Sequence, residues 1–133
     1  MLIQPNMTVL FQGDSITDVG RDRETDDLGR GYARIAAGLF TAKYPKMNVT
    51  FLNKGISGNR TCDLLARWEE DCLALKPDFL SILIGINDTW RRFDSDSPTT
   101  AEQYESNYRA LLTQVRKRLG NIPILLIEPF LMP

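Results

Sequence analysis

Short apolar runs and amphipathic segments alternate along this 133-residue chain. The runs at residues 8–12, 47–52, 78–84 and 122–128 have the apolar, β-branched or aromatic content of strands in a sheet that is covered on both faces. Between them, apolar residues recur at intervals of three and four over residues 32–44, 61–76 and 104–119, which predicts three amphipathic helices. This alternation predicts one α/β domain over residues 1–133, with a parallel sheet and right-handed crossovers.

The spacing also predicts which face of each helix is buried. The first helix should bury a stripe formed by Tyr32, Ile35, Ala36, Leu39 and Phe40. The second should bury Leu64, Leu65, Trp68, Cys72 and Leu75, and the third Tyr104, Tyr108, Leu111, Leu112, Val115 and Leu119. A capping box of Thr99 and Glu102 is expected to start the third helix, and Gly120 to end it. The polar stretches 18–30 and 89–98 are expected to be long loops, which are often functional.

Composition and charge argue against several classes of function. Hydrophobic residues make up 43% and charged residues 25%, and the net charge is −1, so neither a nucleic-acid partner nor a membrane surface is expected. The sequence shows no membrane span and no signal peptide, which predicts a cytoplasmic location. Cys62 and Cys72 would lie about 15 Å apart on one helix, too far for a disulfide. Because there is no histidine to add to them, we expect no metal and no other cofactor.

Polar turns follow the first three predicted strands. Because parallel strands end at the same edge of a sheet, the turns that contain Ser15, Gly58 and Asn87 should be neighbours in space. Ser15 could supply a nucleophilic oxygen, while the Gly58 backbone N–H and the Asn87 side-chain amide could donate to the oxyanion formed in acyl transfer. Each residue also has an ordinary explanation as part of a turn or a cap. The three together, in this order, favour acyl transfer.

Three blocks of sequence carry a resemblance to a known family. They are Gly13-Asp14-Ser15-Ile16-Thr17, Gly58 and Gly85-Ile86-Asn87-Asp88, and they are similar to the first three blocks of the SGNH (GDSL-type) esterases and lipases. Residues 53–59, 66–71 and 84–91 resemble the acetyl-xylooligosaccharide esterase branch. The resemblance implies a flavodoxin-like three-layer α/β/α sandwich with strand order 2-1-3-4-5. It also implies a Ser15 nucleophile, an oxyanion hole of the Ser15 and Gly58 N–H groups and the Asn87 side chain, and a small acylated substrate such as an acetylated sugar.

The resemblance does not extend to the family's fourth block. That block is Asp-x-x-His, which supplies the base, and this chain has no histidine. The family's last strand and closing helix are also missing, so the chain is expected to be the N-terminal two-thirds of an esterase. Residues 124–127, apolar on both faces, would then form an unprotected sheet edge. Hydrolysis by the chain alone is expected to be weak, because an oxyanion hole without a base leaves only residual catalysis.

Two alternatives remain open at this point. Lys54 could replace the missing base, although a lysine needs burial to lower its pKa for that role. The chain could also be a non-catalytic module that binds a small molecule or a protein on the same fold.

Three further residues are candidates for substrate binding. Asp14 is expected either to bond the turn backbone or to contact the substrate. Trp90 could stack on a sugar ring, and Arg91 could hold a hydroxyl group or a carboxylate of a partner subunit. The alternative for Trp90 and Arg91 is a solvated loop or a subunit contact, so a homo-oligomer is a further expectation.

Overall fold

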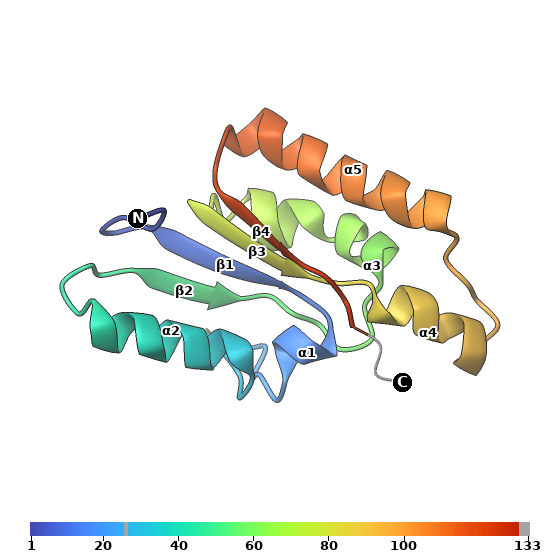
Figure 1. Ribbon diagram of the computed structural model, residues 1–133, viewed down its shortest axis with the longest axis horizontal. Helices are drawn as coiled ribbons and strands as arrows, with labels where there is room; N and C mark the ends of the chain where they lie inside the picture. Colours follow the sequence, from blue (N-terminus) through green and yellow to red (C-terminus); the bar gives the residue numbers. More distant parts are fainter. Residues whose placement is uncertain (26, 131–133) are drawn as a thin grey trace.

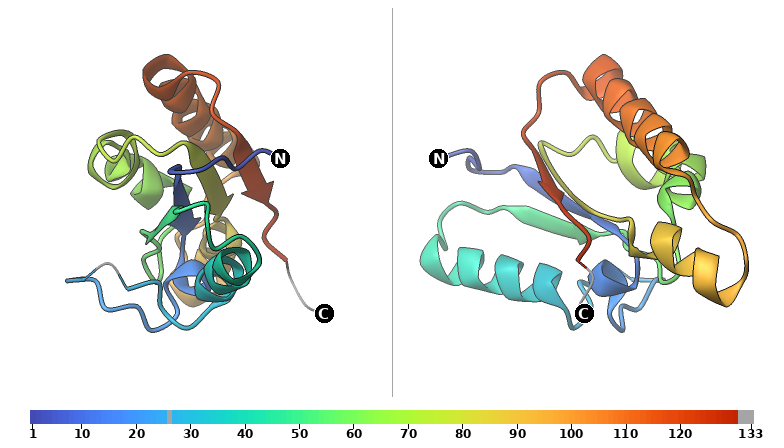
Figure 2. Two further views of the ribbon diagram at one scale, coloured as in Figure 1. Left: turned by 90° about the vertical axis from the view of Figure 1, so that its left-hand side faces the viewer. Right: turned by 45° about the vertical axis from the view of Figure 1, so that its right-hand side comes forward.

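The computed structural model describes residues 1–25 and 27–130, and in it a four-stranded parallel sheet lies between two layers of helices (Figures 1 and 2). The strands are β1 (Thr8–Gly13), β2 (Thr50–Asn53), β3 (Phe79–Leu83) and β4 (Ile124–Ile127), in the order β2-β1-β3-β4. The helical elements are α1 (Ser15–Asp18), α2 (Tyr32–Lys43), α3 (Thr61–Ala66), the π-helical turn η1 (Glu69–Leu73), α4 (Ile86–Asp94) and α5 (Ala101–Leu119). The predicted three-layer sandwich is confirmed, and the strand order matches the first four positions of the expected 2-1-3-4-5.

Alternate side chains of β1 enter two different cores. Leu10 belongs to the larger core, with Trp68 and Val115, on the face that α3 and α5 cover (Figure 1). Val9 and Phe11 belong to the smaller core on the face that α2 covers. A buried side chain of this size contributes about 1.5–3 kcal/mol, so burial on both faces fixes β1 firmly. The carboxyl end of this strand, which leads directly to Ser15, is therefore anchored from both sides.

The buried face predicted for α2 is wrong. Ala33 and Ala37 face the sheet, whereas Ala36 is exposed and Ile35 and Leu39 are 60% and 68% exposed. Small side chains let the helix backbone approach the strands closely, and Phe40 then reaches the sheet from the side to pack on Phe51, with ring centroids 5.8 Å apart. Helical spacing identified the helix, but it could not choose between two adjacent apolar stripes.

The helix predicted over residues 61–76 is interrupted. Its first part is α3, and η1 follows after Arg67, whose backbone has φ −106° and ψ 12°. The predicted inward face is correct for Leu64, Trp68 and Cys72, which are all buried. Both cysteines are free, as expected, although they lie on two elements rather than one.

Two predictions for residues 86–103 are also wrong: the start of a loop and the capping box of the next helix. Residues 86–94 form α4, in a region where a loop was expected to begin at residue 89. The capping box at the start of α5 uses Thr100 and Gln103, one position after the predicted pair. Gly120 ends α5 with φ 71°, as predicted.

β4 forms one edge of the sheet. Leu125 and Leu126 point to opposite faces and are 48% and 46% exposed, in agreement with the expected unprotected edge. Among the described residues, no helix combines the length and the apolar character that crossing a membrane requires.

Candidate active site

The structure brings the three predicted turns to the carboxyl edge of the sheet. Ser15 is the first residue of α1 and is exposed, Gly58 lies in the loop after β2, and Asn87 lies in the first turn of α4 (Figure 1). The Asn87 side-chain amide donates to the backbone oxygen of Asn59 at 2.9 Å. This bond attaches α4 to the residue that follows Gly58.

The loop after β2 also packs closely on the Ser15 turn. A Cβ on Gly55 would lie 2.6 Å from the backbone nitrogen of Asp18 and 2.8 Å from Cβ of Thr17, so only glycine fits there. The backbone N–H of Ile56 donates to the Gly13 oxygen at 3.1 Å. Residues 54–59, which we call the Gly58 loop, are therefore held directly against the end of β1 and against α1.

Backbone donors remain free where the oxyanion hole is expected. Neither the Ser15 N–H nor the Gly58 N–H makes a hydrogen bond to another residue within 1–25 and 27–130. Gly58 has φ +83°, a conformation that favours glycine. A glycine required by the turn can also present its N–H as a donor, so the two roles considered for Gly58 are compatible. The Asn87 amide uses one N–H on Asn59 and keeps a second one available.

Asp14 lies beneath this surface rather than on it. Its side chain is fully buried and caps α1 by accepting the Ile16 backbone N–H at 3.0 Å. The second carboxylate oxygen has no hydrogen-bond partner among the described residues. Burial therefore raises the pKa of Asp14 above its ordinary value, partly offset by the backbone bond to Ile16. Because the side chain is inaccessible, the structure supports the backbone role of Asp14 and not the substrate contact.

Asp18 is a buried carboxylate that the sequence analysis did not single out. Its Oδ2 accepts the Ser57 backbone N–H at 2.9 Å and pairs with Arg23, while Arg21 lies 3.7 Å from its Oδ1. Burial raises the pKa of Asp18, but the hydrogen bonds from Arg23 and Ser57 and the two arginine charges outweigh it and leave the pKa lowered. Asp18 thereby fixes the residue that precedes Gly58.

Asp88 plays a comparable part next to Asn87. Its carboxylate is 4% exposed and accepts from the Thr61 backbone N–H at 3.0 Å and the Thr61 hydroxyl at 2.6 Å. These bonds fasten the start of α4 to the start of α3. Asp88 belongs to the quoted block Gly85-Ile86-Asn87-Asp88, and its bonds to Thr61 agree with the ordinary capping role considered for that turn. Hydrophobic spacing carries no signal for a buried charge, which is why Asp18 was missed.

Trp90 and Arg91 lie on α4 rather than in a loop. Trp90 is 54% exposed. Arg91 forms an ion pair with Asp94, and its Nη2 lies 3.3 Å from the position that a Cβ on Gly58 would occupy. Arg91 therefore borders the Gly58 loop, and Trp90 is open to a ligand.

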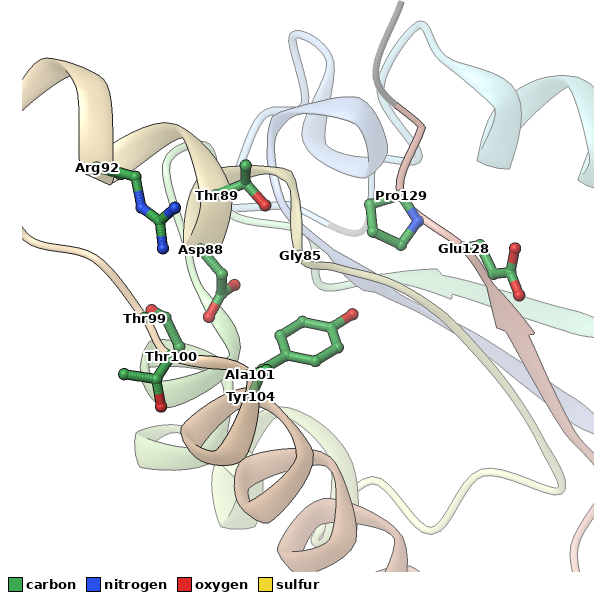
Figure 3. Close-up of a pocket in the computed structure, with 10 residues that line it drawn as sticks. All are labelled: Gly85, Asp88, Thr89, Arg92, Thr99, Thr100, Ala101, Tyr104, Glu128 and Pro129. Carbon is green, nitrogen blue, oxygen red and sulfur yellow. The ribbon is translucent and has the colours of Figure 1, made fainter.

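A cavity of about 590 Å³ lies between α4, the start of α5 and the residues that follow β4 (Figure 3). Asp88, Arg92, Tyr104 and Glu128 are among its lining residues, whereas Ser15 and Gly58 are not. The Ser15 hydroxyl itself has no hydrogen-bond partner among the residues that the structure describes, and that includes Lys54. The substitution of a base by Lys54 thus receives no support from the geometry.

Comparison with known proteins places the chain in a family. The model of the GDSL-like lipase/acylhydrolase family matches residues 11–133. An acetylxylan esterase from Geobacillus stearothermophilus is 42% identical over 139 residues, covering 98% of this chain and 63% of that protein. Its crystal structure superposes with a TM-score of 0.90 over 98% of this chain and 63% of the esterase. Other structures of that esterase are catalytic mutants in which one serine, one aspartate or one histidine is replaced by alanine.

A protein from Parabacteroides merdae described as a GDSL-like lipase is also 42% identical, with a TM-score of 0.92 over 96% of this chain and 62% of that one. The chain thus spans somewhat less than two thirds of the length of these relatives. The matched family residues include all three turns described above. The chain belongs to the GDSL-like lipase/acylhydrolase family.

Proposed function

We propose that residues 1–133 carry the nucleophile and the oxyanion hole of an ester hydrolase that removes acetyl groups from carbohydrates. The observation that carries this proposal is an exposed serine at the start of α1 whose own backbone N–H, like that of Gly58, makes no hydrogen bond within the described residues 1–25 and 27–130. The relative named as an acetylxylan esterase supports the choice of acetyl group and sugar.

In the proposed reaction the Ser15 oxygen attacks the carbonyl carbon of the ester. The negative charge that develops on the carbonyl oxygen is stabilised by the Ser15 and Gly58 N–H groups and by the Asn87 amide. A base takes the Ser15 proton and passes it to the departing sugar oxygen, which leaves as a hydroxyl group. Water then attacks the acetyl-serine, which releases acetate and returns a proton to the Ser15 oxygen. Removing one such donor typically costs about 3 kcal/mol of transition-state stabilisation, so Asn87→Ala should lower kcat about a hundredfold.

The base in this mechanism is proposed to be a histidine outside these 133 residues, since the chain contains none. The catalytic histidine and aspartate mutants of the relative support this assignment. Residues 1–133 alone should then hydrolyse 4-nitrophenyl acetate only weakly. Exposed Trp90 and the adjacent Arg91 are proposed to contact the sugar.

A fusion tests the proposal. Residues 1–133 followed by the C-terminal third of the Geobacillus esterase should hydrolyse 4-nitrophenyl acetate and acetylated xylo-oligosaccharides, and Ser15→Ala should abolish turnover. Ser57→Ala, beside Gly58 but with its side chain exposed, is the matched control and should retain turnover. A folded fusion whose turnover does not depend on Ser15 would contradict the proposal. A folded fusion without any turnover would contradict it as well, and would favour the competing candidate, a non-catalytic binding module, which rests on the chain's lack of histidine.

A further inference from the structure

Arg67 lies next to two of the three turns at the carboxyl edge of the sheet, the one that leads to Ser15 and the Gly58 loop. It follows the last residue of α3, and its side chain is only 14% exposed. A guanidinium is seldom this well buried unless its donors are satisfied. The proposed function gives Arg67 no role, so its contacts require an explanation.

The guanidinium donates to the turns on both sides of it. Its Nη2 donates to the Gly13 oxygen at 3.3 Å, its Nη1 to the Lys54 oxygen at 2.8 Å, and its Nε to Oδ1 of Asn59 at 2.8 Å. Nη1 also contacts the side chains of Asp71 at 2.8 Å and Gln12 at 3.2 Å. The Asp71 carboxylate balances the buried charge.

These contacts reach the segments that lead to Ser15 and that flank Gly58, and they reach Asn87 through one intermediate residue. Gly13 is two residues before Ser15, and Lys54 and Asn59 are the two ends of the Gly58 loop. Asn59 in turn accepts the side-chain amide of Asn87. One side chain therefore connects the ends of β1 and β2 directly, and the start of α4 through a single residue.

We propose that Arg67 is a positioning residue that sets the relative placement of Ser15, Gly58 and Asn87, an inference that rests on the proposed function. The role is indirect, because the guanidinium is largely buried and bonds to protein acceptors on both sides. A lysine could not replace it, since one ammonium group cannot reach acceptors on both sides at once, whereas the planar guanidinium presents five donors. The role therefore depends on the shape of the arginine and not only on its charge.

The test uses the 133-residue chain with Arg67→Lys and Arg67→Met. Arg109→Met is the matched control. Arg109 lies on α5 rather than in one of the three turns, and it forms an exposed ion pair with Glu105 on the same helix. The first measurement is backbone amide hydrogen exchange by NMR. The Ile56 amide, bonded to Gly13, reports on the Gly58 loop, and the Leu80 amide, bonded to Pro123, reports on the sheet.

Exchange should separate a positioning role from a general loss of stability. Hydrogen bonds to a charged group are strong enough that losing them should raise the exchange of Ile56 relative to Leu80 by roughly tenfold to a hundredfold in both Arg67 variants. Global destabilisation would instead raise both rates together. Arg109→Met should leave the ratio unchanged.

The second measurement is the binding of methylboronic acid, followed by boron NMR. The Ser15 oxygen forms a bond to boron and its proton passes to solvent, which leaves a negatively charged tetrahedral boronate that resembles the proposed intermediate. The wild-type chain should give a tetrahedral signal that Ser15→Ala lacks. Arg67→Lys should weaken this binding about tenfold or more, and Arg109→Met should not.

The outcomes distinguish the two proposals. A wild-type chain with no Ser15-dependent boronate would contradict the proposed function, and the positioning role of Arg67 would fail with it. Boronate binding that Ser15→Ala abolishes but Arg67→Lys leaves intact would overturn the inference alone. A change in exchange without a change in boronate binding would make Arg67 a structural residue and would likewise overturn the inference.

Discussion

Asp88→Asn tests whether a buried carboxylate fixes the start of α4, and with it Asn87. The wild-type carboxylate accepts both the backbone N–H and the hydroxyl of Thr61. The Thr61 hydroxyl oxygen already accepts the side-chain amide of Asn107 at 3.0 Å, so its own hydrogen must point at Asp88. An asparagine keeps one oxygen for the Thr61 N–H but presents an NH2 group to the hydroxyl, whose hydrogen then has no acceptor.

The magnitude follows from these two bonds. A hydrogen bond to a charged group contributes about 1.5–3 kcal/mol, and a buried donor without a partner costs about 1–3 kcal/mol. Asp88→Asn exchanges one charged bond for a neutral one and leaves one hydroxyl without an acceptor, so we expect a loss of about 2–3 kcal/mol in the free energy of unfolding. Asp88→Ala leaves both Thr61 donors without an acceptor and should cost more.

The assay is urea denaturation at pH 7, followed by the fluorescence of buried Trp68. Asp96→Asn is the control, an exposed aspartate for which a change within about 0.5 kcal/mol is expected. Thr61→Val combined with Asp88→Asn should cost clearly less than the sum of the two single changes, because both remove the same bond. If Asp88→Asn is no less stable than Asp96→Asn, the carboxylate does not hold α4 and this reasoning is refuted.

Three further results are expected. Gly55→Ala should lower the free energy of unfolding by about 1–3 kcal/mol, because the new Cβ would meet backbone atoms. Gly38→Ala, on α2 with open space around it, should raise the free energy of unfolding by up to about 1 kcal/mol. Thermal unfolding measures both, and a loss of stability in both variants would contradict this. Asp14→Asn should stabilise the chain at pH 7. Burial raises the pKa of Asp14, so the folded state favours the protonated carboxyl group, and this contribution to stability is lost as the pH rises through the raised pKa. The neutral asparagine avoids that loss. The gain in melting temperature should shrink in acid, and an equal gain at both pH values would count against it. Burial raises the pKa of Cys72 to about 12, whereas Cys62 is half-buried. Iodoacetamide should therefore label Cys62 before Cys72 in the folded chain, as read by mass spectrometry. Equal labelling rates at the two cysteines would contradict the prediction.

The sequence was sufficient to predict the strands and the edge at which the turns meet. β1 and β3 are apolar on both faces, a pattern that few other structures produce, and parallel strands must end together. This is why the sequence alone could place Ser15, Gly58 and Asn87 at one edge of the sheet. Their chemical roles remain predictions, since proximity does not establish catalysis.

The misses have two physical origins. On α2, the choice of buried face depends on how closely the helix approaches the sheet, and Ala33 and Ala37 allow a closer approach than Ile35 and Leu39 would. The break after α3 coincides with Arg67, whose side chain bonds to Gly13, 54 residues earlier in the chain. Local spacing carries no information about either.

The core and the turns are stabilised by different forces, and this difference explains the arrangement of the site. Apolar burial in the sheet is not directional, so it can hold β1 and β3 together without fixing the turns beyond them. Asp18, Arg67 and Asp88 supply directional bonds to those turns, and each satisfies enough donors or acceptors to offset the cost of burying a charge. Loss of apolar packing should therefore lower stability along the whole chain, while loss of one charged group should loosen one turn. The placement of the Ser15 turn, the Gly58 loop and the start of α4 then depends on these buried charged groups as well as on the core.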